Sequence, residues 1–343
     1  MKKQLSKTRK IGLTVAALAV IALLFIYFLA LAPNFGVKRY VYVYVDNRHS
    51  YKNLCEQIQD SAHCRNMATF RFLASALRYP GKMKAGRYIV RKGMGNLTLL
   101  RNLRNGNQEP VHLTFNNIRF KTDLAERLSQ QLMCSKDEIL KRLNDTLYCD
   151  SLGFKPETVI AMFIPNTYDI YWNISPDKLM KRMKHEYDNF WNDKRKAQAQ
   201  QIGLSPVEVA TLASIVEEET ASKDEYPLVA GVYINRLHIG MPLQSDPTVK
   251  FAVGDFSLHR ILFEHLSVDS PYNTYKYVGL PPGPLRVPSI QGMEAVLNYT
   301  HHNYIYMCAK EDFSGRHNYA ATLNEHVRNA NRYRAALDAR NIR

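Results

Sequence analysis

Hydrophobic positions divide the chain into three stretches with different periods. An uncharged run from Ile11 to Ala32 comes first, and it exceeds the roughly 20 apolar residues that cross a bilayer. A period of two follows in VKRYVYVYVDN, and helical periods dominate after about residue 116. The pattern predicts an α+β protein with an N-terminal transmembrane helix, a small α+β module and a larger helix-rich α+β domain.

Basic side chains stand ahead of the apolar run: Lys2, Lys3, Lys7, Arg9 and Lys10. By the positive-inside rule they stay in the cytoplasm. The alternative is a cleaved signal peptide, because Ala30-Leu31-Ala32 resembles a small-residue cleavage site, but signal peptides have shorter apolar regions of about 7–15 residues. We therefore expect a cytoplasmic tail over 1–10, a retained single-pass anchor over 11–32, and the chain after Pro33 beyond the membrane.

The module over residues 38–115 mixes strands with short helices. Valines and tyrosines alternate over 40–45, so the valines share one face of a strand. Further strands are predicted at Tyr88–Val90 and at Val111–Phe115, which closes the module. Helices are predicted at Lys52–Gln59, at Asn66–Leu77, and in NLTLLRNLRNG, where Leu97, Leu100 and Leu103 share a face and Gly106 ends the helix. A module of this size suits a binding role.

Helices dominate residues 116–343. They are predicted at Thr122–Met133, Lys136–Leu143, Pro176–Trp191, Ser205–Thr220, Tyr226–Leu237 and Leu323–Leu337. The segment GLPPGPLRVP, residues 279–288, is unsuited to a helix or a central strand, so we expect a rigid loop there. A hairpin is predicted around Ser314-Gly315.

The composition and charge of the chain limit the classes of binding partner. The chain has 343 residues, 46% of them hydrophobic, and a net charge of +15, which admits anionic lipids, an acidic wall polymer or nucleic acid. The basic residues are scattered rather than gathered on one recognition helix, and the predicted topology places the domains outside the cytoplasm. We therefore expect no nucleic acid among the partners.

Cysteines and histidines carry little predicted chemistry. In an oxidising compartment, Cys55 with Cys64 and Cys134 with Cys149 could close short loops, with Cys308 as the fifth cysteine. The histidines, including His301-His302, His317 and His326, lack zinc-ligand spacing and are expected on the polar surface. Phosphate-binding and G-x-S-x-G signatures are also missing, so we expect neither a metal nor a cofactor.

Three consecutive glutamates end the helix predicted over 205–220. Ser205 is a candidate N-cap, Pro206 suits the first helical position, and Glu208 completes a capping box. This assignment fixes which way each glutamate faces, because successive residues turn by about 100° around a helix.

Glu219 is the glutamate that returns to the apolar face. That face is centred near Leu212, and Glu219 lies within roughly 20° of it, whereas Glu217 and Glu218 lie about 140° and 120° away. We expect Glu217 and Glu218 to face water and to discourage ionisation of Glu219. A core-facing carboxyl either pairs with a buried cation or keeps its proton through desolvation and offers it to a substrate.

The segment LASIVEEET, residues 212–220, resembles the glutamate motif of the endolytic murein transglycosylases, the YceG-like proteins, whose usual form is close to L-A-S-I-[IV]-E-K-E-T. The second glutamate of that E-K-E pattern is the catalytic residue of the family, and it aligns with Glu219. Glu218 stands where the family often has lysine, so the local charge differs.

Other motifs follow in the order of that family. They are INRLHIGMPLQSDPTV at 234–249, YNTY at 272–275 and GLPPGP at 279–284. Upstream, KAGRY at 84–88 and LLRNLRNG resemble a LysM-like domain, and HNYAATLNEH resembles the closing H-x-F segment with Tyr319 for phenylalanine. FIPNTY departs from the family, because Asn166 replaces its usual aspartate.

The resemblance implies a lyase, a lytic transglycosylase that cleaves the β-1,4 bond between N-acetylmuramic acid and N-acetylglucosamine without water. One carboxyl can donate the proton and then act as base, and Glu219 is expected to do both. Products would carry 1,6-anhydro-N-acetylmuramic acid ends.

Four further residues are candidates for contact with the glycan. A hydrolase would ordinarily need a second carboxylate, and Asp246 is the nearest in sequence. Asp246-Pro247 also suits an N-cap and first turn, so a structural role and a place beside the cleft both stay open. Gln244, Asn273 and Tyr275 could bind sugar hydroxyl or acetamido groups, or instead stabilise their loops.

We therefore expect an inner-membrane protein, with its catalytic domain on the periplasmic side, that cuts nascent glycan strands near the membrane. The rival hypotheses are a hydrolytic muramidase and a non-catalytic peptidoglycan-binding scaffold of the wall-synthesis complex. A peptidoglycan synthase is a further partner that the resemblance alone suggests.

Overall fold

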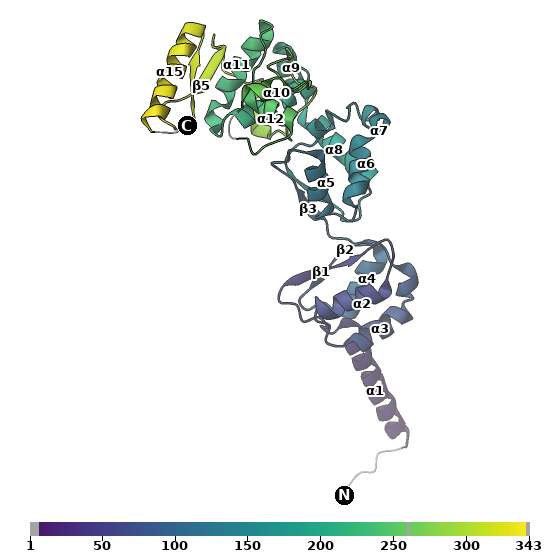
Figure 1. Ribbon diagram of the computed structural model, residues 1–343. Coiled ribbons are helices and arrows are strands. Elements are labelled where there is room, and N and C mark those ends of the chain that lie inside the picture. The colour runs from purple at the N-terminus through teal and green to yellow at the C-terminus, as the bar shows by residue number, and fades with distance from the viewer. Residues whose placement is uncertain (1–6, 259–260, 341–343) are drawn as a thin grey trace. The chain divides into compact units, whose positions relative to one another are not determined.

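The computed structural model describes residues 7–258 and 261–340, which form two compact units (Figure 1). The first unit holds the chain up to Leu113 together with Gln131–Met133 and Tyr168–Ile174. The second holds Thr114–Gln130, Cys134–Thr167 and the chain from Ser175 onward. Part of the predicted cytoplasmic tail, including Lys2 and Lys3, lies outside the described residues.

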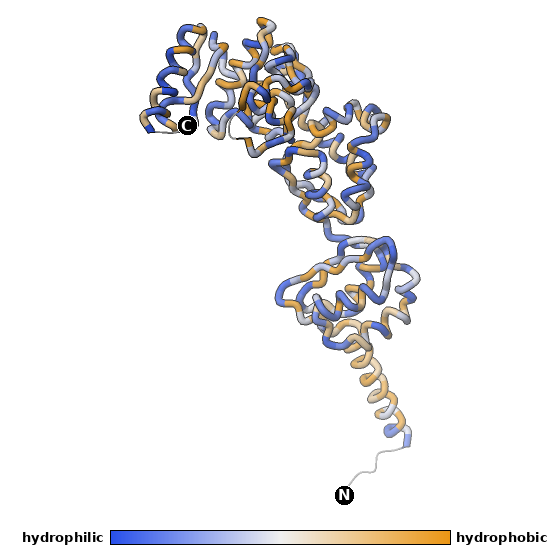
Figure 2. Tube along the Cα trace, viewed as in Figure 1, coloured by the Kyte–Doolittle hydropathy of each residue, from blue (hydrophilic) through white to orange (hydrophobic). Residues whose placement is uncertain are grey.

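The apolar run near the N-terminus is helical. Helix α1 spans Lys7–Ile26 and continues as the π-helical turn η1, Tyr27–Leu31. Figure 2 shows the hydrophobic colouring along α1, and the 25-residue stretch is long and apolar enough to cross a membrane, with a mean hydropathy of 2.7 over an 18-residue window. A signal sequence near an N-terminus meets the same criterion. The predicted helix is confirmed by these bounds.

The end of this helix packs into the first unit. Asn96 Nδ2 donates to the carbonyl oxygen of Leu29 at 2.9 Å, and Pro33 forms a β-bridge with Gly95. A side chain at Gly95 would place its Cβ 2.8 Å from the carbonyl carbon of Leu31. Only glycine allows this close approach, so η1 and the loop before α4 fit together as one packed contact.

A two-stranded antiparallel sheet and three helices build the core of the first unit. Strand β1, Tyr40–Val45, pairs with β2, Gly86–Arg91. Val43 and Val45 are buried while Tyr40 is exposed, which confirms the alternation that the sequence predicted. The helices are α2, Tyr51–Asp60; α3, Met67–Ala76; and α4, Asn96–Asn105.

Helix α4 ends as predicted but turns a slightly different face to the core. Gly106 adopts φ 78° at its C-terminus, a left-handed conformation that favours glycine. Leu99, Leu100 and Leu103 are fully buried, whereas Leu97 is half-buried. The buried stripe is therefore centred one position away from the predicted one.

The strand expected to close the module has a different partner. Strand β3, Val111–Thr114, pairs with β4, Thr167–Ile170, and does not join the β1–β2 sheet. Residues just after β4 belong to the first unit and pack inside it: the Trp172 ring meets Tyr44 edge-on at 4.9 Å, and Asn173 Nδ2 donates to the Ala85 carbonyl. The two strands lie more than fifty residues apart in sequence, so a local hydrophobic pattern could not predict that they pair.

Helices make up most of the second unit. They are α5, Lys121–Ser129; α6, Lys136–Asn144; α7, Thr146–Ser151; α8, Pro176–Phe190; α9, Asp193–Gln201; α10, Pro206–Glu219; α11, Tyr226–His238; α12, Asp246–Val253; α13, Phe263–Leu266; α14, Ile290–Leu297; and α15, Leu323–Ala339. Strands β5, Tyr306–Ala309, and β6, His317–Ala320, form the predicted hairpin.

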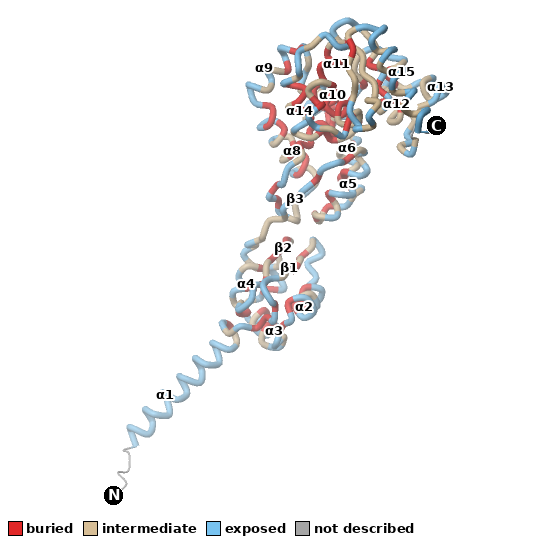
Figure 3. The backbone as a smooth tube through the Cα atoms, turned by 90° about the vertical axis from the view of Figure 1, so that its left-hand side faces the viewer, coloured by how far each residue is buried: buried red, intermediate tan, exposed pale blue. Residues whose placement is uncertain are grey.

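Helix α10 lies at the centre of this unit, where burial is most concentrated (Figure 3). Every side chain from Val209 to Val216 is buried, because α9, α11, α12 and α14 pack around the helix. The predicted rigid loop over 279–288 contains neither helix nor strand. A Cβ at Gly283 in this loop would lie 2.9 Å from the Glu157 carbonyl carbon, so glycine allows the loop to pack there.

All five cysteines lie in described segments and are free thiols. The disulfides considered from the sequence are therefore not formed. Cys55, Cys64, Cys134 and Cys149 are buried, and burial raises the pKa of Cys134 to about 11. These side chains fill the core as small apolar groups.

Candidate active site

A capping box fixes the start of α10, the helix that carries Glu219. Ser205 Oγ accepts from the backbone N–H of Glu208 at 3.3 Å, and the Glu208 carboxylate accepts from the Ser205 N–H at 2.7 Å. Pro206 occupies the first position. The predicted capping box is confirmed. It fixes the first residue of the helix, and Glu219, thirteen residues after Pro206, is the last.

Glu219 is half-buried at the C-terminal end of α10. Its Oε1 accepts one hydrogen bond from the hydroxyl of Tyr233, at 2.5 Å, and a second from the hydroxyl of Ser245. Within the described parts of the chain, no arginine or lysine forms an ion pair with it. Two neutral hydroxyl groups therefore hold this carboxyl group.

Burial raises the pKa of Glu219 above its ordinary value. The hydrogen bonds from Ser245 and Tyr233 act in the opposite direction, because they favour the charged form. The negative charge of Asp246 adds to the rise, and His317 lowers the pKa. Desolvation outweighs the other effects, so the pKa of Glu219 lies above its ordinary value.

The expectation that Glu217 and Glu218 face water is wrong. The Glu217 side chain is 6% exposed and accepts from the Ser289 N–H at 2.9 Å and from the Ser289 hydroxyl. Glu218 is 18% exposed and pairs with Arg119 at 2.7 Å and Arg286 at 2.9 Å. The prediction assumed one apolar face, whereas α10 is buried on all sides.

These pairs also change the electrostatic argument. Arg119 and Arg286 supply two positive charges beside Glu218, and the carboxylate that raises the pKa of Glu219 is Asp246. The acidic neighbourhood that the sequence indicated on α10 is therefore compensated by arginine, and the acidic influence comes from a different helix.

Asp246 directly follows Ser245, whose hydroxyl donates to Glu219, but Asp246 does not cap its helix. Ser245 occupies the N-cap position of α12, and Asp246 is the first helical residue. The exposed Asp246 carboxylate accepts from the hydroxyl of Tyr275 at 2.6 Å. Since Ser245 donates to Glu219, this short segment brings Asp246 and Tyr275 to the same site.

The other two predicted glycan-contact residues have different surroundings. Gln244 is exposed beside Ser245 and adopts φ 49°, a left-handed conformation. Asn273 is fully buried, and its Nδ2 donates to the carbonyls of Leu266 and Val268 at 2.9 Å each. Asn273 therefore stabilises its loop, which is the alternative that the sequence left open.

A buried pair that the sequence did not indicate lies behind the end of α10. Glu225 is 4% exposed, and its carboxylate oxygens accept from His317 Nδ1 at 3.3 Å and from the His317 backbone N–H at 2.9 Å. The His317 side chain is 13% exposed, so the prediction of a surface histidine is wrong for this residue. The two lie 92 positions apart in sequence.

Aromatic side chains gather near the arginine that pairs with Glu218. Phe120, Phe251 and Tyr272 line a pocket of about 230 Å³ together with Arg119. The Arg119 guanidinium also lies over the Phe256 ring at 4.1 Å. Flat apolar surfaces next to a cation are typical of surfaces on which ring-shaped ligands stack.

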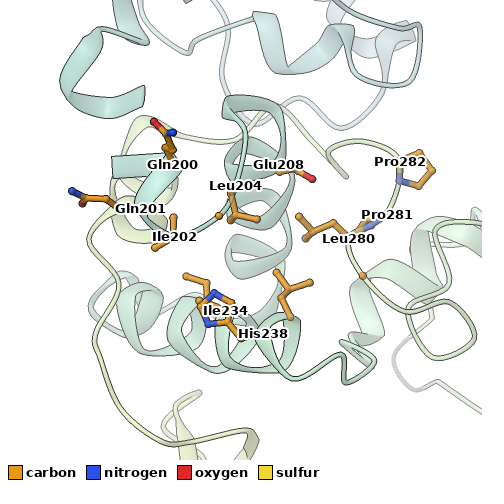
Figure 4. Close-up of a pocket in the computed structure, with 13 residues that line it drawn as sticks. Gln200, Gln201, Ile202, Leu204, Glu208, Ile234, His238, Leu280, Pro281 and Pro282 are labelled. Atoms are coloured by element: carbon orange, nitrogen blue, oxygen red, sulfur yellow. The ribbon is translucent and has the colours of Figure 1, made fainter. Parts of the chain in front are cut away.

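A larger pocket of about 630 Å³ lies elsewhere on the unit (Figure 4). Its lining includes Glu208, Ile234 and His238 together with Leu280 and Pro282 of the glycine- and proline-rich loop. Glu208 lies in the first turn of α10 and Glu219 in its last. The pocket is therefore near the opposite end of the helix from the carboxyl group.

Comparisons with known proteins agree with these motifs. A model of the YceG-like family matches residues 43–332. The endolytic murein transglycosylase of Bacillus subtilis (strain 168) is 30% identical over 275 residues, which cover 75% of this chain and 75% of that relative. The protein of the same name from Streptococcus pneumoniae (strain D39) is 28% identical and matches 85% of this chain, but the match spans only 58% of the relative.

A solved structure supports the fold. The 2.6 Å crystal structure of a putative YceG-like protein from Listeria monocytogenes is 26% identical, covers 85% of this chain and 99% of its own, and superposes with a TM-score of 0.54. The family model spans well over half of the chain. This chain belongs to the YceG-like family.

Proposed function

We propose that this protein is an endolytic lytic transglycosylase that cuts the glycan strands of peptidoglycan, with Glu219 as the group that transfers protons. The observation that carries the proposal is the state of that carboxyl group. It is half-buried, its pKa is raised by burial, and its described partners are the hydroxyls of Tyr233 and Ser245. The names of the curated relatives support the same activity.

The reaction needs two proton transfers and no water. Glu219 donates its proton to the glycosidic oxygen as the bond to C1 of N-acetylmuramic acid breaks, releasing the N-acetylglucosamine side as an alcohol. The C6 hydroxyl of the same muramic acid then attacks C1 and gives its proton to the Glu219 carboxylate. The acid form is restored, and the new end is a 1,6-anhydro sugar. A general acid that becomes the base in the next step satisfies this sequence.

Tyr233 and Ser245 would position the carboxyl group through both steps. Both hydroxyls donate to Oε1, which leaves Oε2 to face the substrate. Their hydrogen bonds stabilise the carboxylate that forms after the first transfer, because a donor favours the charged form of its acceptor. Gln244, Asp246 and Tyr275 are the candidates for contact with the sugars, since Gln244 and Asp246 flank Ser245 in the chain and Tyr275 donates to Asp246.

The N-terminal helix supports a location at the membrane. It is long and apolar enough to span a bilayer, and its end packs against the first unit through Asn96 and Gly95. Cleavage after Ala32 would remove the Leu29 carbonyl that Asn96 binds, so the packing favours retention of the helix. A retained anchor would restrict the enzyme to newly made strands near the outer face of the inner membrane.

The test is digestion of purified peptidoglycan by the full chain in detergent, with product ends identified by mass spectrometry. We expect internal cleavage that yields 1,6-anhydro ends, and we expect the Glu219→Gln variant to lose activity by about a thousandfold, because the proposed proton donor is removed. Glu264→Gln, an exposed residue of α13, is the matched control. Retained activity in the Glu219→Gln variant would exclude the proposal.

A hydrolytic muramidase is the second candidate, and the placement of Asp246 favours it. The carboxylate is exposed close to Glu219, where it could activate water or stabilise the forming cation. The same digestion in ¹⁸O-labelled water separates the two reactions. A muramidase gives labelled reducing ends that depend on Asp246, whereas the transglycosylase gives unlabelled anhydro ends.

A further inference from the structure

Arg236 is a buried cation on α11 that contacts two other segments of the second unit. The residue is 8% exposed. Its Nε donates to the Ile305 carbonyl oxygen and its Nη1 to the Leu243 carbonyl oxygen, at 2.6 Å each. Within the described parts of the chain, no carboxylate forms an ion pair with this guanidinium. Burial of a charge without a paired carboxylate is unfavourable, so the position of the side chain depends on these two hydrogen bonds.

The Leu243 carbonyl belongs to the turn that joins α11 to α12. Leu243 is fully buried, and the donor that its carbonyl oxygen has among the described residues is Arg236. The backbone of Arg236 holds the same turn, because its carbonyl oxygen accepts from the Met241 N–H at 2.9 Å. Arg236 therefore fixes the path of the turn at two points.

This turn leads directly to Ser245, one of the two hydroxyl groups that bond to Glu219. Ser245 lies two residues after Leu243, and Tyr233 lies about one helical turn before Arg236 on α11. Both hydroxyls donate to Oε1 of Glu219. Arg236 thus lies between the two donors in the chain. The donors can converge on one oxygen atom only if the segment that joins them keeps its path.

The two hydrogen bonds of the guanidinium differ in importance for the site. The segment that contains Ile305 has a second attachment to α11, because Asn235 Nδ2 donates to the carbonyls of His302 at 2.7 Å and Tyr304 at 2.9 Å. That segment can stay in place without Arg236. The bond to the carbonyl that precedes Ser245 by two residues is therefore the one through which Arg236 reaches the site.

We propose that Arg236 is a positioning residue of the active site: by holding the buried Leu243 carbonyl, it sets the place from which Ser245 donates to Glu219. The inference rests on the proposed function, because it assigns the residue that keeps a hydrogen-bond partner of the acid in place. Arg236 acts through Ser245 and does not touch the sugars. A catalytic group misplaced by about 1 Å can lose much of its effect, so the path of this turn controls the rate.

The experiment is a double-mutant cycle on kcat, with the full chain in detergent and purified glycan strands. We expect Arg236→Lys to lower kcat about tenfold and to leave KM unchanged within roughly twofold. Lysine keeps the charge but lacks the planar fork that reaches two carbonyls. In a chain that already carries Ser245→Ala, the same substitution should lower kcat by less than about twofold, because the hydroxyl that it would misplace is gone.

Arg195→Lys is the matched control. Arg195 lies on α9, donates to the Phe190 carbonyl at 2.8 Å and pairs with Glu294, with 27% of its side chain exposed. We expect this substitution to reduce stability but to leave kcat unchanged, with or without Ser245→Ala. Activity is expressed per folded molecule, from the urea transition of each variant, so that a loss of stability is not counted as a loss of kcat.

A second variant, Arg236→Met, removes the buried charge and leaves the Leu243 carbonyl without its donor. We expect the same dependence on Ser245. Losses of kcat that are equal in the two backgrounds overturn the inference, as does an unchanged kcat in both single variants. Failure of both variants to fold overturns it as well, because Arg236 would then be a requirement of the fold itself. Failure of the wild-type chain to form anhydro ends would instead overturn the proposed function.

Discussion

Ser245 stands at the N-cap of α12, yet its hydroxyl donates to Glu219 and accepts no hydrogen bond from the backbone of its own helix. A serine at this position would ordinarily satisfy one of the free N–H groups of the first turn. Here the residue serves the acid on α10 instead, so its substitution should affect chemistry more than helix stability.

We expect Ser245→Ala to raise the pKa of Glu219 further, because a hydrogen bond that favours the carboxylate is lost. The alkaline limb of the pH–activity profile should move to higher pH and kcat should fall. The same profile of Ser205→Ala provides the contrast. That serine caps α10, so its loss should lower the free energy of unfolding by about 1 kcal/mol without moving the limb. A limb that moves only in Ser205→Ala would contradict the assignment.

Glu219 should reduce the stability of the fold at neutral pH. Its pKa in the folded chain is raised above the ordinary value of 4.5, so its contribution is most favourable below about pH 4.5 and is lost as the pH rises through the folded-state pKa. Each unit between the two pKa values corresponds to about 1.4 kcal/mol.

We therefore expect Glu219→Gln to unfold with a higher free energy than the wild type at pH 8 and with a similar one near pH 4. Urea denaturation at the two pH values measures the difference. A variant that is less stable than the wild type at pH 8 would show that the carboxylate is favourably paired in the folded chain.

Arg286 should be a major support of the end of α10. Its guanidinium lies 2.9 Å from Glu218 and 3.9 Å from Glu217, and its side chain is 18% exposed. Replacement by methionine leaves Glu217 without a cation and Glu218 with Arg119 alone. We expect a loss of about 2 kcal/mol in the free energy of unfolding, less than the roughly 3–5 kcal/mol of a fully buried pair because water reaches part of this one.

The matched control is Arg182→Met. Arg182 forms an ion pair with Glu186 one helical turn away on α8, with 41% of its own side chain exposed, and such pairs contribute less than about 1 kcal/mol. Equal losses in the two variants, measured by chemical denaturation, would mean that the cluster at α10 is no stronger than an ordinary surface pair.

Gly292 should resist substitution by alanine although it lies inside a helix. A Cβ at this position would lie 2.9 Å from Cδ of Glu217, and the Glu217 carboxylate is held in place by the Ser289 N–H. Alanine normally stabilises a helix interior by roughly 1 kcal/mol relative to glycine. We expect Gly292→Ala to lose about 1–3 kcal/mol through overpacking. Gly81→Ala, where the Cβ would meet open space, is the control in the same denaturation measurement.

Local rules predicted the elements that depend on neighbouring residues. The Val/Tyr alternation places Val43 and Val45 inside β1, Gly106 ends α4, and Ser205 begins α10. Each signal lies within a few residues of the structure that it specifies, so a single sequence is enough to recognise it.

The contacts of the site are different in kind. Ser245 lies 26 positions from Glu219, and His317 lies 92 positions from Glu225. Periodicity could choose Glu219 among three glutamates but could not name its partners. The prediction that Glu217 faces water was wrong for a related reason. Helix α14 packs against α10 and covers a side that the helical wheel leaves open.

The close fit of Gly95 and Asn96 against the end of η1 has a mechanical consequence. A flexible linker would let the first unit rotate and sample a wide range of distances from the membrane. A helix whose last turn packs tightly against that unit is instead a rigid connection. If α1 crosses the bilayer, the first unit stands at one height above the lipid and tilts only as the helix tilts. A glycan strand that bound to this unit would then run at a set distance from the lipid surface, and the length of the anchor would determine that distance.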